Sequence, residues 1–212
     1  MDARATTHDR TDWRELVTVV LLSVTAILTA WTGFQASKWS GAMSIAFSQA
    51  STARIEASRL DADANRKQTI QVQLFSQWLS AYQQGDTQLA DFLEQRFPEP
   101  LKTAFPVWIA SRPLQNPDAA ASPFALPEYA IPETAQAEAS DARADAKFRE
   151  ALRNNQRGDN YTALTIAFAA VLFFGALAGR MRDRRSQWAL LTLGIVGCLV
   201  LSGILVSFPK LV

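Results

Sequence analysis

The strongest constraint on this chain is the separation of its charges, which leaves three long apolar windows. Residues 16–37, 161–179 and 186–209 contain no Asp, Glu, Lys, Arg or His. An α-helix rises about 1.5 Å per residue, so roughly 20 apolar residues cross the hydrocarbon core of a bilayer. Lipid offers the backbone no hydrogen-bond partner, so each window must be helical. The sequence therefore predicts three transmembrane helices and a lipid bilayer as the first partner of the chain.

The segment between the second and third windows predicts the orientation. Residues 180–185 hold four arginines and one acid, Asp183, and the arginines are Arg180, Arg182, Arg184 and Arg185. Arginines in short loops are retained on the cytoplasmic side of the membrane. We therefore expect residues 1–15 and 180–185 in the cytoplasm, and residues 38–160 and 210–212 outside it. A cleaved signal peptide is the alternative for the first window, but the apolar run exceeds the usual length.

The expected exterior segment, 38–160, contains two alanine-rich stretches with helical spacing. The first places small residues at intervals of four and three, at Ala46, Ala50, Ala53 and Ala57. The second repeats this spacing at Ala135, Ala139, Ala142 and Ala146. Such spacing is typical of the buried seam of a coiled coil. The sequence predicts an antiparallel alanine-rich stalk, and pairing with a second copy of the chain is the alternative.

A proline-rich segment, 98–132, separates the two stretches. Its eight prolines prevent any long helix. Gly85 and Asp86 predict the end of the preceding helix, and residues 87–97 predict a short amphipathic one. A disordered linker rarely holds many large apolar side chains, so we expect an ordered cap over the stalk. A compatible alternative is a partner-binding surface formed by Phe105, Trp108, Phe124 and Tyr129.

Two patterns inside the windows suggest helix contacts. The hydroxyl groups of Thr18, Thr25, Thr29 and Thr32 fall on one face of the first window. They predict packing between helices, or alternatively the lining of a pore in an oligomer. Gly175 and Gly179 form a GxxxG pattern, which permits close approach of a neighbouring helix.

Catalytic and metal-binding signatures are missing from the sequence. The one histidine, His8, and the one cysteine, Cys198, lie far apart along the chain. No CxxC pair, P-loop or dinucleotide-binding fingerprint occurs. The net charge of +1 gives no basic surface for nucleic acid. We therefore expect no enzyme activity, cofactor or metal.

The layout resembles a family of uncharacterised bacterial three-span membrane proteins that carry a domain of unknown function (DUF4337-like). Two pieces carry the resemblance, SIAFSQASTARIEASRL after the first window and RMRDRRSQW between the last two. The family has one span, a helical extramembrane stretch and two further spans joined by an arginine loop. The resemblance implies a protein of the bacterial inner membrane and brings no catalytic residues.

These observations predict an all-α protein with three transmembrane helices, the exterior stalk and its proline-rich cap. Its expected role is that of a structural, interaction or assembly subunit, acting on copies of itself or on another membrane complex. An oligomeric channel lined by the threonine face is the first alternative. A sensor-like accessory protein is the second.

Overall fold

The computed structural model describes residues 13–113 and 115–211, and these residues form helices and no strands. The helices are α1 (Trp13–Gln84), α2 (Thr87–Glu94), α3 (Leu101–Ala110), a 3-10 turn η1 (Pro123–Ala125), α4 (Pro132–Ala178) and α5 (Arg184–Ser207). The predicted all-α class is confirmed. His8 and most of the N-terminal tail lie outside the described residues. The chain divides into two compact units, a terminal unit (1–47 and 148–212) and a central unit (48–147).

The terminal unit contains the three apolar windows. They lie in α1, α4 and α5, and each is long and apolar enough to cross a membrane. Large apolar side chains such as Ile27, Leu199 and Val206 remain 68–73% exposed. Surfaces of this kind are costly in water and stable in lipid. The terminal unit therefore fits a multi-pass membrane protein.

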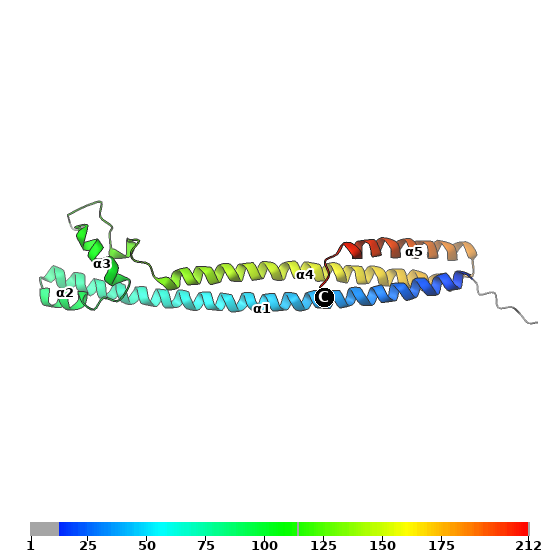
Figure 1. Cartoon of the computed structure of the whole chain (residues 1–212), viewed down its shortest axis with the longest axis horizontal. Coiled ribbons are helices and arrows are strands. Elements are labelled where there is room, and N and C mark those ends of the chain that lie inside the picture. The colour runs from blue at the N-terminus through cyan, green and yellow to red at the C-terminus, as the bar shows by residue number, and fades with distance from the viewer. Residues whose placement is uncertain (1–12, 114, 212) are drawn as a thin grey trace, which may run out of the picture. The chain divides into compact units, whose positions relative to one another are not determined.

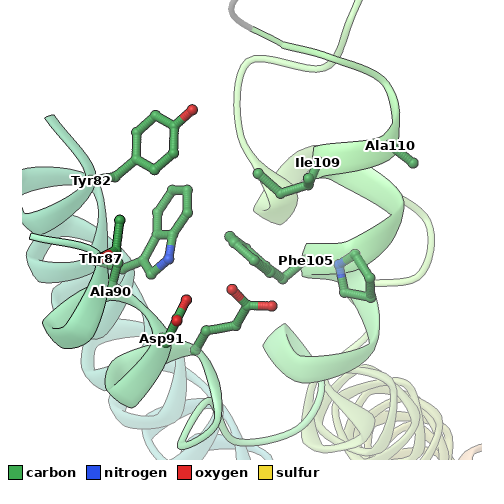
Figure 2. A pocket seen from close by; sticks show the side chains of 10 residues that line it. Tyr82, Thr87, Ala90, Asp91, Phe105, Ile109 and Ala110 are labelled. Atoms are coloured by element: carbon green, nitrogen blue, oxygen red, sulfur yellow. The ribbon is translucent and has the colours of Figure 1, made fainter. Parts of the chain in front are cut away.

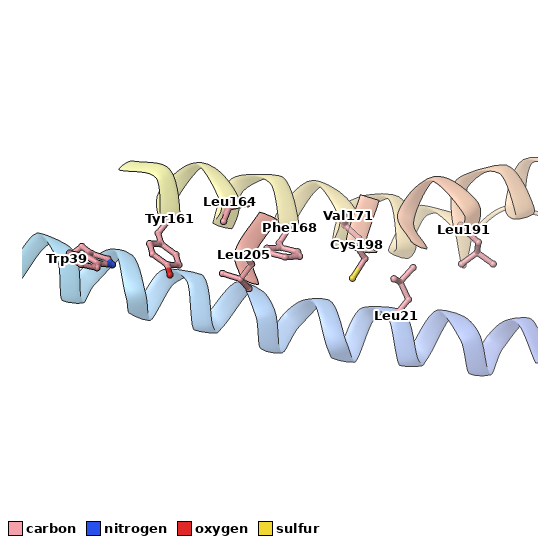
Figure 3. Packing of buried hydrophobic residues seen from close by; sticks show 10 residues of the cluster. Leu21, Trp39, Tyr161, Leu164, Phe168, Val171, Leu191, Cys198 and Leu205 are labelled. Atoms are coloured by element: carbon pink, nitrogen blue, oxygen red, sulfur yellow. The ribbon is translucent and has the colours of Figure 1, made fainter. Parts of the chain in front are cut away.

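The three helices of the terminal unit pack side by side around an apolar interior (Figures 1 and 3). Tyr161, Phe168 and Leu191 are fully buried there. Small residues let the helices approach closely. A Cβ added to Gly175 would lie 2.9 Å from the Leu22 side chain, and one at Gly194 would lie 3.1 Å from that of Leu21. Dispersion contacts between closely packed helices replace the hydrophobic effect inside a membrane.

In the central unit α1 and α4 run antiparallel, and ion pairs define their register. Arg54 on α1 contacts two carboxylates on α4, at 2.5 Å from Asp141 and 2.7 Å from Asp145. Lys67 pairs with Glu133 further along the same two helices. Arg54, Asp141 and Asp145 are about half exposed, so their pairs contribute little to stability. Together they nevertheless align the two helices in one register.

The buried seam of α1 agrees with the prediction, whereas that of α4 does not. Ala46, Ala50, Ala53 and Ala57 are 2–7% exposed. On α4 the predicted Ala135, Ala139, Ala142 and Ala146 are all exposed. The buried positions in the central unit are instead Ala137, Ser140 and Ala144. Alanines occupy both faces of this stretch, and the face that meets α1 is the one that brings Asp141 and Asp145 to Arg54.

The corrected seam predicts a contrast between two alanines on α4. Ala144 is fully buried, so Ala144→Leu overpacks the α1–α4 contact and should destabilise the protein by about 1–3 kcal/mol. Ala139 is exposed, so Ala139→Leu should change stability by less than about 0.5 kcal/mol. Thermal unfolding of the detergent-solubilised chain, followed by far-UV circular dichroism, measures both. Equal effects of the two substitutions would contradict the corrected seam and favour the predicted one, in which Ala139 is buried.

The pair between Lys67 and Glu133 predicts a pH dependence. The hydrogen bond from Lys67 and a backbone hydrogen bond lower the pKa of the Glu133 carboxyl from its ordinary 4.5. A lowered folded-state pKa stabilises the fold above the unfolded pKa, and this contribution disappears as the pH falls through the folded pKa. The native chain should therefore lose its advantage over Glu133→Gln below about pH 4.5. The matched control is Glu138→Gln, at an exposed position without an ion pair among the described residues.

Candidate functional site

An aromatic cluster forms the core of the central unit away from the α1–α4 pair. Phe75 and Trp78 on α1 meet Phe105 and Trp108 on α3, and all four are at most 8% exposed. The ring centroids of Trp78 and Phe105 are 4.7 Å apart, and those of Phe75 and Trp108 are 5.3 Å apart. Both pairs are edge-to-face, the geometry that aromatic rings favour. The cluster therefore holds α3 against the end of α1.

The turn between α1 and α2 forms as the sequence predicts. Gly85 has a φ of +74°, in the left-handed region where glycine commonly ends a helix. The Asp86 carboxylate then accepts a hydrogen bond from the Leu89 N–H at 3.0 Å and caps α2. Ala90 and Leu93 on α2 are buried in the aromatic cluster. Asp91 and Glu94, the acidic residues of α2, are exposed.

A buried glutamine positions α3, and no pattern in the sequence points to it. Gln71 is 2% exposed and lies on α1. Its Oε1 accepts a hydrogen bond from the Leu101 N–H at 3.1 Å, and its Nε2 donates to the Glu99 carbonyl at 3.0 Å. The first N–H groups of a helix have no partner within that helix, so Gln71 satisfies one of them. Only the tertiary structure brings residues 71 and 101 together.

The proline-rich segment folds onto the cluster. Pro106 lies inside α3, whose ten residues agree with the expectation that no long helix forms here. The Trp108 indole N–H donates to the Ala120 carbonyl at 2.7 Å and ties the following loop to α3. Phe124 packs against Phe75 with ring centroids 5.5 Å apart. The apolar side chains of this segment thus have partners within the central unit.

A cleft of about 500 Å³ opens between α2, α3 and the end of α1. Figure 2 shows Tyr82 and Asp91 on one side and Phe105 and Ile109 on the other. The remaining lining comes from Trp78, Thr87, Ala90, Glu94, Pro106 and Ala110. Clefts of roughly 300–1,000 Å³ that combine apolar walls with a few polar groups are typical of small-molecule sites. This cleft is the candidate functional site.

Four aromatic residues were predicted as a partner-binding surface, and the structure corrects two of them. Phe105 and Trp108 are 3% and 5% exposed because they form the core of the central unit. Phe124 and Tyr129 pack against that core and are partly buried. Burial also raises the pKa of the Tyr129 hydroxyl. Of the four, only Phe105 lines the cleft, which Tyr82, Asp91 and Glu94 border.

The threonine face of the first window lies inside the terminal unit. Thr18, Thr25 and Thr32 are 0–8% exposed. The Thr25 hydroxyl donates to Cys198 Sγ on α5 at 3.6 Å, and Thr165 on α4 donates to the Thr32 hydroxyl at 2.9 Å. Thr29 is partly buried and donates to a carbonyl of its own helix, that of Thr25, at 2.7 Å. The hydroxyls of Thr25 and Thr32 thus join α1 to the other two apolar helices.

A second buried glutamine holds the C-terminal segment. Gln35 is fully buried, and its amide makes two hydrogen bonds with the backbone of Leu211, at 3.0 and 3.2 Å. The Tyr161 hydroxyl donates to the Pro209 carbonyl at 3.1 Å. The sequence led us to expect residues 210–212 outside the cytoplasm. The anchoring of Pro209 and Leu211 depends on side chains from α1 and α4 and has no local signal.

Gly175, Gly179 and the four loop arginines were also predicted from the sequence. Gly175 faces Leu22 on α1, whereas the space around Gly179 is bounded by atoms of its own helix. The four loop arginines, Arg180, Arg182, Arg184 and Arg185, are exposed. Asp183 caps α5 by accepting a hydrogen bond from the Ser186 N–H at 3.0 Å, which lowers the pKa of its carboxyl. The loop therefore presents a compact group of positive charges.

Chemical reactivity has little support in the described residues. Within them, no group of three His, Cys, Asp or Glu side chains is arranged to hold a metal ion. Cys198 is buried among apolar side chains and accepts a hydrogen bond. The cleft has two hydroxyl groups, on Thr87 and Tyr82, and among the described residues neither is hydrogen-bonded to the Asp91 or Glu94 carboxylate. Its groups are suited to binding.

Comparisons with known proteins identify no relative. No protein-family model, curated protein or solved structure matches the chain. The resemblance to the DUF4337-like family therefore remains a prediction.

The role of Gln71 predicts a specific loss of stability. Gln71→Ala removes both hydrogen bonds to the start of α3 and leaves the buried Leu101 N–H without a partner. The expected cost is about 1–3 kcal/mol. Near-UV circular dichroism of the aromatic cluster during thermal unfolding measures it. The control is Gln73→Ala at an exposed position, expected within about 0.5 kcal/mol of the native chain. If Gln71→Ala unfolds like this control, Gln71 does not position α3.

Proposed function

We propose that the chain is a non-enzymatic, multi-pass protein of the bacterial inner membrane that acts through binding by its central unit outside the cytoplasm. The observation that carries this proposal is the division of the fold. The terminal unit holds the three apolar helices, whereas the central unit has an aromatic core and a cleft of its own. A domain that served only to link two spans would need neither.

The orientation in this proposal rests on the arginine loop. Arg180, Arg182, Arg184 and Arg185 lie between the second and third apolar helices, and such loops remain cytoplasmic. One crossing, that of the first apolar window, separates the N-terminus from residues 38–160. These residues would therefore lie on the opposite side of the membrane from the N-terminus. The α1–α4 pair would form the stalk of the exterior domain, and residues 98–132 would form its cap.

The binding role is supported by exposed apolar side chains on the helices that border the cleft. Leu89 and Phe92 on α2 are 44% and 50% exposed, and Val107 and Ile109 on α3 are 44% and 41% exposed. Apolar surface that stays in water marks contact sites when it gathers in one region. The partner is either a second copy of the chain or another membrane complex.

The channel hypothesis receives less support. A pore lined by α1 needs its threonines to face water, but Thr25 and Thr32 contact α5 and α4. Their burial favours the other interpretation, in which the hydroxyls pack helices together. We therefore propose a binding role and not ion conduction.

The orientation is tested with single cysteines in a Cys198→Ala background. Ala121→Cys places a thiol in the proline-rich segment and Arg182→Cys places one in the arginine loop, both at exposed positions. A membrane-impermeant maleimide added to intact spheroplasts should label the first and spare the second. Permeabilised cells provide the control, because both thiols should then react. The reverse pattern in intact spheroplasts would contradict the proposed orientation.

The binding role is tested by photo-crosslinking in native membranes. A benzophenone side chain at Phe92 should give discrete adducts, either a dimer of the chain or one heterologous product. The matched control is the same group at Arg59, an exposed residue of α1 outside the α2–α3 region. Monomer alone at both positions would overturn the interaction role.

A further inference from the structure

The cleft combines two features that are separate elsewhere in the central unit, a wall of aromatic and aliphatic groups and two carboxylates. The wall comes from Phe105, Pro106 and Ile109 on α3 and from Tyr82 on α1. Asp91 and Glu94 are three positions apart on α2 and both line the cleft, as side chains at this spacing share a helix face. Apolar and anionic surfaces therefore face the same space.

Asp91 and Glu94 are both exposed. Among the described residues, neither carboxylate makes an ion pair or a side-chain hydrogen bond. Arg96, the base nearest in sequence, stacks over the Phe92 ring at 3.7 Å and donates to the Phe92 carbonyl. Residues 71–131 contain six acids and three bases, a net charge of −3. The cleft thus lies in an anionic part of the chain.

The packing of the aromatic rings determines which ring surfaces a ligand can contact. Phe75 and Tyr82 stack on Trp78 at 5.9 and 5.3 Å with small interplanar angles, so the Trp78 faces are occupied. Tyr82 is 52% exposed, which leaves ring surface open to a ligand. The orientation of the Phe105 ring is fixed by its perpendicular contact with Trp78. The walls offer apolar contact and one open aromatic ring.

We propose that this cleft binds a small organic cation, in which an ammonium or guanidinium group contacts Asp91 and Glu94 and an apolar body lies against Phe105, Ile109 and Tyr82. Charge complementarity selects the cation, because charge-assisted hydrogen bonds to carboxylates are stronger than neutral ones. Tyr82 adds attraction between a cation and its ring. The volume of about 500 Å³ is suited to a compact molecule. An anion of the same shape would meet two uncompensated negative charges.

This inference depends on the local geometry of the cleft and not on the proposed orientation in the membrane. Full-length protein in detergent micelles is titrated with phenethylammonium by isothermal calorimetry. Two matched probes share the phenyl ring and chain, the neutral 2-phenylethanol and the anionic phenylacetate. Phenethylammonium should bind at least about tenfold more tightly than either. Binding should weaken as salt is raised, since the carboxylates are solvated.

Substitutions in the cleft test where phenethylammonium binds. Asp91→Asn combined with Glu94→Gln should reduce the affinity for phenethylammonium at least about tenfold, to that of 2-phenylethanol. The charge-matched control is Glu128→Gln, an exposed acid of the same unit outside the cleft, which should leave the affinity unchanged. Far-UV circular dichroism confirms that each variant is folded. A second variant, Ala110→Trp, fills the cleft and should abolish binding with both carboxylates present.

Three results would overturn the proposal: no binding of phenethylammonium, equal binding of phenylacetate, or unchanged affinity in the Asp91 and Glu94 double variant. The outcome is distinguishable from that of the crosslinking experiment. Crosslinking at Phe92 without binding of phenethylammonium would support the interaction role and contradict the cation site. A chain that binds the cation without crosslinking keeps the site and loses the interaction role.

Discussion

The hydrogen-bonding demand of the backbone inside lipid is the constraint on which the rest of the structure depends. No water is present there to bond an exposed N–H or C=O, so the three charge-free windows must be helices. Two of these windows lie at the ends of much longer helices, α1 and α4. The same two helices supply the paired part of the central unit. In that unit the two helices run antiparallel.

Polar side chains perform different tasks in the two units. In the terminal unit, hydroxyls and the Gln35 amide are buried and bond to other helices or to the C-terminal backbone, because an unpaired polar group is costly in an apolar interior. In the central unit Arg54, Asp141 and Asp145 are about half exposed to water. Their ion pairs add little energy and lie beside the face of α4 that meets α1. Gln71 is the exception, since it is buried and bonded to the backbone that begins α3.

The aromatic cluster explains how a segment with eight prolines becomes ordered. Proline removes backbone donors and limits helix length, so local hydrogen bonds alone do not hold residues 98–132. Large rings compensate by burying apolar area against α1, with Phe75 and Trp78 as the fixed side of the contact. The cleft arises where α2 and α3 diverge beside these rings. Its two carboxylates, Asp91 and Glu94, come from α2, whose Leu93 is buried in the aromatic cluster.

The sequence by itself determined the helical class, the three apolar windows, the turn at Gly85 and Asp86, and the seam Ala46 to Ala57. These features follow from local composition and periodicity, which act over a few helical turns. The tertiary structure decided the buried face of α4, because alanines lie on both of its faces and their spacing fits either one. It also decided that Phe105 and Trp108 are core, and that Tyr82, Asp91 and Glu94 border one cleft. Which side chains converge across distant helices depends on packing, and residue spacing along one helix does not encode it.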